Sequence, residues 1–191
     1  KAWDHIERIT ARAVWSPEVV LVTGAGAIGL LAALLGGQRG LEVHVLDRVS
    51  TGPKPGLVAD LGATYHSGTL SDALAHADVI VECTGVGELV LDAIDKTAPD
   101  GIVCLTGVSP AGRRLTIDAG ALNRELVLEN EVVFGTVNAN RRHYQAAAAA
   151  LANADQGWLD RFITRRVPLD RWSDALQRRP DDVKAIIDLG G

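Results

Sequence analysis

Residues 20–29 read VLVTGAGAIG, in which an apolar run ends on three glycines, Gly24, Gly26 and Gly29, before a helical pattern begins. A strand that turns directly into a helix around a pyrophosphate needs one residue that tolerates positive φ. It needs a second residue without a side chain where the phosphates approach, and a third that lets the helix pack on the strand. The three glycines have this spacing. The stretch therefore predicts a dinucleotide-binding turn, with backbone N–H groups and the positive end of the helix dipole facing the ligand.

Strand and helix patterns alternate along the chain around this turn. The expected strands are almost continuously apolar, which is typical of a sheet buried on both faces. This alternation predicts an α/β fold, a doubly wound parallel (Rossmann) sheet in a three-layer αβα arrangement. The expected strands are 19–23, 42–47, 79–84, 101–107 and 127–137. The expected helices are 27–39, 55–61, 86–97, 119–124 and 141–155.

The two ends of the chain do not follow this alternation. The first part reads as a helix, and the last part as a weaker pattern with a helix at 170–178 and a final strand within 183–191. Because the chain begins with lysine and contains no methionine, we expect a piece of a longer protein. We predict three parts: a connecting helix (1–13), a dinucleotide-binding domain (14–155) and a C-terminal tail (156–191).

Composition excludes several classes of function. The net charge is −5 and the pI about 5.5, so no basic surplus indicates a nucleic-acid or membrane partner. No apolar stretch approaches the roughly 18 residues of a membrane-spanning helix, and no signal peptide begins the chain. Cys83 and Cys104 both lie in apolar runs, which favours buried, reduced thiols in a cytoplasmic protein.

The end of the second expected strand bears on the choice of dinucleotide. Asp47 lies 18 residues after Gly29, where an acidic side chain can accept bonds from the hydroxyls of an adenosine ribose. Its carboxylate would repel a 2′-phosphate and thus favours NAD. Arg48 and Lys54 leave NADP open, since either cation could bind that phosphate.

Three further strand ends are expected to line the dinucleotide site, because ligands of a doubly wound sheet bind in a crevice beyond the carboxyl ends of the strands. Small residues in CTGVGE and LTGVSP would leave room for the rings of the cofactor. The candidates for this wall are Thr84, Gly85, Gly107 and Val108. Asn138 and Asn140 could both reach nicotinamide or substrate, although Asn140 is equally plausible as the N-cap of the following helix.

Catalytic groups are not recognisable in the chain. The five histidines have no metal-ligand spacing, no CxxC pattern occurs, and neither cysteine has a plausible base beside it. We therefore predict no metal site and no catalytic residue in this chain, only the cofactor-binding half of an enzyme.

Several motifs, in order, resemble the cofactor domain of glucose 1-dehydrogenases of the zinc-dependent medium-chain dehydrogenase superfamily. The likeness covers nearly the whole chain, and FGTVNANRRHY followed by ITRRVPLDRW is more specific than the glycine turn. The stretches that carry it are VLVTGAGAIGLLAALLGGQRGLEVHVLDR, ECTGVGELVLDAI, GIVCLTGV, FGTVNANRRHYQAA and ITRRVPLDRWSDAL.

The resemblance implies that the parent enzyme oxidises D-glucose or a related aldose to the lactone with NAD(P)+. A separate GroES-like domain would carry zinc and the proton relay, the two ends of this chain would pack on it, and the parent would be a homo-oligomer. This chain alone would bind cofactor without catalysis. Carried over by motif, the cofactor residues are Gly24, Gly26, Ala27, Ile28, Gly29, Asp47, Arg48, Thr84, Gly107 and Val108, with Asn138 also facing the sugar.

Other functions stay open from the residues themselves. The cofactor domain of another zinc dehydrogenase, acting on polyols, threonine or simple alcohols, would share most of these features. A stand-alone dinucleotide-sensing module would also need the glycine turn, although it would not need the two atypical ends. A methyltransferase is disfavoured, because Gly29 and the helix that follows suit a dinucleotide better.

Overall fold

The computed structural model describes residues 1–177 and 179–190. Its centre is a parallel sheet of six strands in the order β3-β2-β1-β4-β5-β6. The order reverses between β1 and β4, as it does in doubly wound dinucleotide-binding folds. The predicted fold class is thereby confirmed. The strands are β1 (Val19–Thr23), β2 (Glu42–Leu46), β3 (Thr64–His66), β4 (Ala77–Glu82), β5 (Thr97–Leu105) and β6 (Val132–Gly135).

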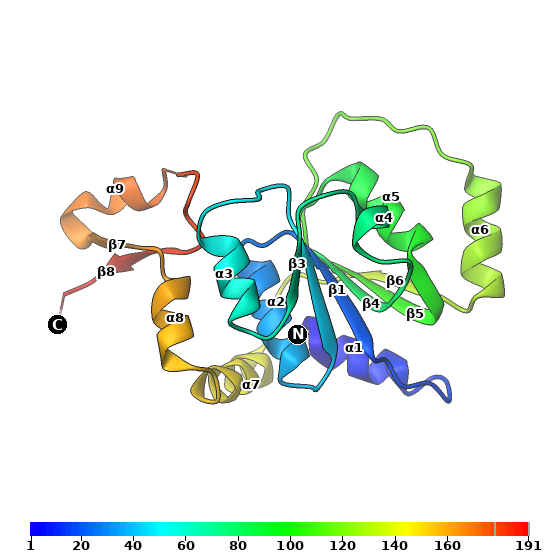
Figure 1. Cartoon of the computed structure of the whole chain (residues 1–191), viewed down its shortest axis with the longest axis horizontal. Helices are drawn as coiled ribbons and strands as arrows, with labels where there is room; N and C mark the ends of the chain where they lie inside the picture. Colours follow the sequence, from blue (N-terminus) through cyan, green and yellow to red (C-terminus); the bar gives the residue numbers. More distant parts are fainter. Residues whose placement is uncertain (178, 191) are drawn as a thin grey trace.

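Helices cover both faces of the sheet and make the three predicted layers (Figure 1). One core cluster takes residues from α1 (Ala2–Thr10), α2 (Ala27–Gly37), α3 (Pro53–Ala59) and α8 (Gln156–Phe162). The other takes residues from α4 (Leu70–Ala73), α5 (Gly87–Asp95) and α6 (Ala119–Leu128). The Ala-rich helix α7 (Arg141–Ala152) leads from β6 toward α8.

Successive strand residues enter opposite cores. In β1, Val20 and Val22 pack into the cluster on the α2 side, whereas Leu21 packs into the cluster on the α5 side. The same alternation places Ile80 of β4 and Val103 of β5 beside Leu21. Burial on both faces explains why these strands are apolar at nearly every position.

The C-terminal segment forms a second, two-stranded parallel sheet of β7 (Arg165–Pro168) and β8 (Ala185–Asp188). Between them lie the 3-10 turn η1 (Leu169–Arg171) and the short helix α9 (Trp172–Ala175). Helix α8, at the start of the predicted tail, instead packs on the main domain: Trp158 is buried and its Nε1–H donates to the carbonyl of Leu57 at 2.8 Å. The predicted three-part division stays a prediction, but α1 and α8 share the core of the large sheet.

The largest difference from the sequence-based elements lies in residues 127–137. Val127 and Leu128 end helix α6 instead of starting a strand, and the strand is only β6. The helix gives way to the strand near Asn130, which has a φ of 53° and thus reverses the chain. The short elements β3 and α4 were not predicted, and of the helix expected at 170–178, residue 178 lies outside the described residues.

Within the part of the chain that the structure describes, no helix has the length and apolar character needed to cross a bilayer.

Gly29 provides the first test of this architecture. A Cβ at Gly29 would overlap the carbonyl oxygen of Gly24, so Gly29→Ala must push α2 away from β1. We expect the free energy of unfolding to fall by about 1–3 kcal/mol in urea denaturation, as for other overpacked cores.

The matched control is Gly37→Ala at the other end of the same helix. A Cβ there would meet only the carbonyl oxygen of Leu61 at 3.9 Å, an ordinary contact. Since alanine has a higher helix propensity than glycine, this variant should be as stable as the wild type or gain up to about 1 kcal/mol. Equal losses in both variants would contradict the close contact at Gly29.

Candidate functional site

The glycine turn forms where β1 passes into α2. Gly24 has a φ of 92°, and its N–H donates to the carbonyl of Leu46, the last residue of β2, at 2.6 Å. Gly26 is the N-cap of α2 and makes no side-chain cap, and a Cβ built on it would have no neighbour within 4 Å. The first N–H groups of a helix lack intrahelical partners. This turn therefore offers uncapped donors and open space, as an anion such as a pyrophosphate requires.

Asp47 lies just beyond β2, beside this turn, but its carboxylate points into the protein. Oδ2 accepts from the N–H of Ala25 at 2.8 Å and from Nζ of Lys54 at 2.9 Å, and Oδ1 accepts from the N–H of Val49 at 3.0 Å. Lys54 is only 9% exposed. Asp47 thus joins the glycine turn to the start of α3 through a largely buried ion pair.

The electrostatic balance at Asp47 favours the ionised carboxylate. Burial works against ionisation, but the bonds from Lys54 and from the backbone N–H groups of Val49 and Ala25 outweigh it and hold the pKa of Asp47 below its usual value. Because the charge of Lys54 lies 2.9 Å away, this carboxylate presents far less net negative charge to a ligand than a lone aspartate would.

Arg48 lies next to this pair and is exposed. Among the interactions of the described residues, none involves its guanidinium. The cation is therefore available to an anionic group that binds beside the end of β2.

The turns after β4 and β5 lie against each other. A Cβ on Gly24 would come within 2.9 Å of Cγ2 of Thr84, so the glycine turn after β1 also lies against the turn after β4. A Cβ on Gly85 would lie 2.6 Å from the carbonyl of Val108, and one on Gly107 would overlap the N–H of Gly85. These predicted wall residues therefore come together as one surface of backbone.

The remaining predicted residues lie at the rim. Ala27 and Ile28 occupy the first turn of α2, with Ile28 59% exposed. Val108 is 84% exposed. It belongs to residues 106–118, the long segment that arches from β5 to α6 (Figure 1). Asn138 is exposed in the loop after β6, at the same edge of the sheet, and makes no hydrogen bond with the other predicted residues in the described structure. Asn140 is the N-cap of α7, one of the two roles considered for it.

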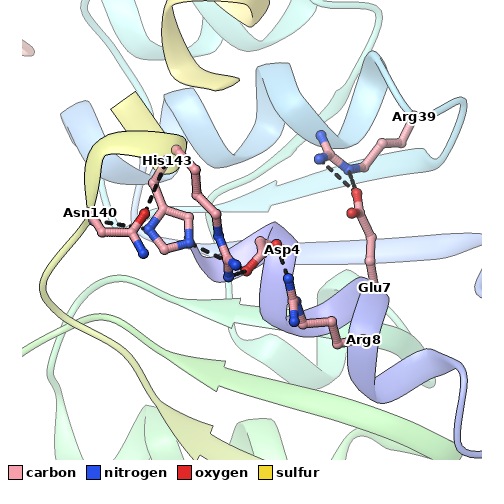
Figure 2. A network of polar contacts seen from close by, with 7 residues as sticks. Asp4, Glu7, Arg8, Arg39, Asn140 and His143 are labelled. Carbon is pink, nitrogen blue, oxygen red and sulfur yellow. Dashed lines mark hydrogen bonds and ion pairs between the residues drawn. The ribbon is translucent and has the colours of Figure 1, made fainter. Parts of the chain in front are cut away.

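A polar network fixes the start of α7 against α1 (Figure 2). The N–H of Asn140 donates to Nδ1 of His143 at 3.0 Å, so the ring proton of the neutral imidazole lies on Nε2, which faces Oδ2 of Asp4 at 3.3 Å. Arg142 and Arg8 also donate to the Asp4 carboxylate, at 2.7 and 3.2 Å. Burial opposes ionisation, but these bonds and charges hold the pKa of Asp4 at about 2. The loop that carries Asn138 is thereby anchored at its far end.

Two features of the site were not predicted. Glu82, the last residue of β4, is 0% exposed and accepts hydrogen bonds from the turn that follows it. A charged residue inside the apolar run VIVECTG was the available signal for it. The Asp4–His143 contact joins residues far apart in the sequence, and no local pattern marks it.

The described residues contain no group of three or more His, Cys, Asp or Glu side chains arranged to hold a metal ion. Both cysteines are free, as expected, with Cys104 buried and Cys83 partly so. Burial raises the pKa of Cys83 to about 11 and that of Cys104 to about 12, so neither thiol is an activated nucleophile.

Comparison with known proteins gives a consistent result. The family model "Glucose dehydrogenase C-terminus" matches residues 1–189. Glucose 1-dehydrogenase from Methanocella arvoryzae is 35% identical over 200 residues, which cover 100% of this chain and 56% of that protein. The enzyme from Thermoproteus tenax is 34% identical over 188 residues, with 96% and 54% covered. The chain thus spans just over half the length of these relatives.

Solved structures show the same relationship. Haloferax mediterranei glucose dehydrogenase in complex with NADP, Zn and gluconolactone superimposes with a TM-score of 0.91 at 28% identity, over 100% of this chain and 56% of that one. The fold and the comparisons together define a Rossmann-type domain of a dehydrogenase. More particularly, the chain belongs to the glucose dehydrogenase C-terminus family. The resemblance inferred from the sequence motifs is confirmed.

Asp47 can be tested through stability. Asp47→Asn removes the charge that pairs with Lys54, and we expect the free energy of unfolding at pH 7 to fall by about 1–3 kcal/mol, as for other buried groups that lose a partner. Since the folded pKa is depressed, the stabilisation is present above about pH 4 and is lost as the pH falls through the folded value. Urea denaturation should show a smaller difference in the free energy of unfolding between wild type and Asp47→Asn at pH 3 than at pH 7.

Asp60→Asn is the control, because its ion pair with Arg161 is exposed. We expect a change within about 0.5 kcal/mol at either pH. A larger loss in Asp60→Asn than in Asp47→Asn would mean that the Asp47–Lys54 pair does not organise the turn.

Asp4 can be tested through hydrogen exchange. Asp4→Asn weakens the contacts to His143 and Arg142, so amides of residues 136–144 should exchange faster while those of β1 stay protected. Because the pKa of Asp4 is depressed, the difference from wild type should exist above about pH 4 and disappear as the pH approaches 2. Glu7→Gln, which alters the neighbouring exposed pair with Arg39, should leave the loop unchanged (Figure 2).

Proposed function

We propose that the chain is the NAD(P)-binding domain of a sugar-oxidising dehydrogenase, whose parent converts D-glucose or a related aldose to the aldonolactone. The observation that carries the proposal is the uncapped N-terminus of α2 at Gly26, which faces open space beside Asp47. The relative from Haloferax mediterranei, whose structure holds NADP, Zn and gluconolactone, supports it. The bound nicotinamide would accept the hydride at C4.

The proposed roles follow the order of the strands. The N–H groups of Gly24–Gly29, with Ala27 and Ile28 on the first turn of α2, bind the pyrophosphate. Asp47, Arg48 and Lys54 form the adenosine side. The surface of Thr84, Gly85, Gly107 and Val108 forms the wall of the nicotinamide half, and Asn138 is placed to reach nicotinamide or sugar from the loop after β6.

The choice between NAD and NADP depends on how much charge Asp47 presents. The preference for NAD assumed a carboxylate facing the ribose, but Lys54 neutralises it at 2.9 Å and Arg48 is exposed beside it. A 2′-phosphate would therefore meet the exposed cation of Arg48 beside an ion pair that carries no net charge. We propose that the site accepts both dinucleotides, and that Arg48 binds the 2′-phosphate of NADP.

The rest of the reaction requires residues that this chain does not contribute. Its described residues do not fit a zinc ion, so we propose that zinc and the proton relay belong to the GroES-like domain of the parent. Exposed apolar side chains of the C-terminal segment, including Trp172 and Leu176 at α9 and Leu189 after β8, would pack on that domain. The parent would be a cytoplasmic homo-oligomer, a location with which the free cysteines agree.

Calorimetric titration with NAD+ and NADP+ tests the proposal. We expect wild type to bind both, and Gly26→Ala to bind each at least about tenfold more weakly, a loss of about 1.4 kcal/mol. The fold has room for the new methyl group, so the melting temperature should not change, and the loss would come from the methyl group blocking the phosphates.

Gly37→Ala, at the opposite end of α2, should bind like wild type. Binding of neither dinucleotide by the wild-type chain would contradict the proposed function of this chain. Unchanged affinity in Gly26→Ala would place the pyrophosphate elsewhere.

A further inference from the structure

Glu82 is a buried carboxylate to which the proposed function assigns no role. It ends β4, is 0% exposed, and no ion pair of the described residues includes it. A buried charge without a cation is costly unless many donors surround it.

The partners of the Glu82 carboxylate are all donors, which suits its ionised form. Oε1 accepts from the N–H groups of Thr84 and Gly85 at 2.7 and 3.0 Å, and from the hydroxyl of Thr23 at 3.3 Å. The hydroxyl of Thr84 also donates to Oε1, while it accepts from the N–H of Val86 at 3.0 Å. Oε2 accepts from the N–H of Gly85 at 3.2 Å. The carboxylate thus holds the turn after β4 and touches the end of β1.

The main chain of Glu82 holds the neighbouring turn. Its carbonyl oxygen accepts from the N–H groups of Thr106 and Gly107 at 2.8 and 3.0 Å, and from the hydroxyl of Thr106 at 2.8 Å. A Cβ on Gly107 would lie 2.7 Å from Oε2 of Glu82, so the second turn passes directly over the carboxylate. One residue therefore sets the positions of both turns that form the wall surface.

The place of these turns assigns them to one half of a dinucleotide. The pyrophosphate belongs at the turn after β1 and the adenosine ribose at the end of β2, so the turns after β4 and β5, on the other side of β1, serve the nicotinamide half. The nicotinamide ring is cationic when oxidised and neutral when reduced. Only one layer of backbone, at Thr84–Gly85 and Gly107, separates the Glu82 carboxylate from this side of the crevice.

We propose that Glu82 is a positioning residue for the nicotinamide half of the site, and that its buried negative charge makes the site favour the oxidised cofactor over the reduced one. It does so without touching the cofactor, through the two turns and through its charge. The inference rests on the proposed function, since it requires that the crevice bind a dinucleotide.

The test compares the affinities of NADP+, NADPH and ADP for wild type, Glu82→Gln and Glu82→Asp. Glutamine keeps an oxygen for the donors at Oε1 but removes the charge. We expect the ratio of the dissociation constants of NADPH and NADP+ to fall by about five- to thirty-fold, the range for unit charges roughly 8–15 Å apart at an effective dielectric of about 20. ADP, which occupies only the adenosine and pyrophosphate side, should bind with unchanged affinity.

Glu82→Asp keeps the charge but shortens the reach to the turns. We expect both NADP+ and NADPH to bind more weakly while their ratio stays within about twofold of wild type, with ADP again unchanged. Glu18→Gln, which removes an exposed carboxylate at the opposite edge of the sheet, should change none of the three affinities.

The outcomes separate this inference from the proposed function. If the wild-type chain binds none of the three ligands, the proposed function fails, and the inference with it. If wild type binds but Glu82→Gln leaves the ratio unchanged, or if either variant loses ADP as strongly as NADP+, Glu82 has only a structural role and the inference is overturned.

Discussion

The backbone contact between Gly29 and the carbonyl of Gly24 is the constraint on which the rest of the site depends. No side chain fits between them, so α2 begins directly on the end of β1 and its N-terminus faces the carboxyl edge of the sheet. The same turn brings the N–H of Ala25 to the Asp47 carboxylate, and it places Gly24 so close to Thr84 that a Cβ on Gly24 would lie 2.9 Å from Cγ2 of Thr84. The ends of three neighbouring strands, β2, β1 and β4, are thereby held at fixed distances.

Two carboxylates, Asp47 and Glu82, complete this arrangement from inside the protein. Each accepts backbone N–H groups of a turn instead of projecting into solvent, and the bonds offset the cost of burying the charge. Asp47 has a cation beside it, whereas Glu82 has only dipoles. These bonds order the turns without a ligand, which would lower the entropic cost of binding a dinucleotide there. The two sides of β1 also differ in charge, because Asp47 is paired with a cation and Glu82 is not.

Much of this fold could be predicted because its signals are local. Three glycines in six positions after a β-branched run determine a strand, a turn and a helix without reference to the rest of the chain. Elements shorter than a few residues carry no such signal, and β3 and α4 were missed for that reason. The strand expected from Val127 began too early because the apolar residues that end α6 resemble those of β6.

The site was harder to predict because its bonds join distant residues. The position of Asp47 at the end of β2 could be predicted from its spacing to Gly29. Its ion pair with Lys54 could not, because that pair depends on how α3 packs beside the end of β2. The role of Glu82 depends on a turn 24 residues further on, and Asp4 meets His143 across 139 residues. A single sequence shows the residues that can form such contacts but does not show which of them pair with one another.

The most direct test of the central claim is a crystal structure of this chain with NADP+. The account predicts pyrophosphate oxygens within hydrogen-bond distance of the N–H groups at Gly26–Ile28, with the adenosine on the side of Asp47 and Arg48 and the nicotinamide against Thr84–Gly85 and Gly107. A dinucleotide bound away from the N-terminus of α2, or with its two halves reversed across β1, would contradict it.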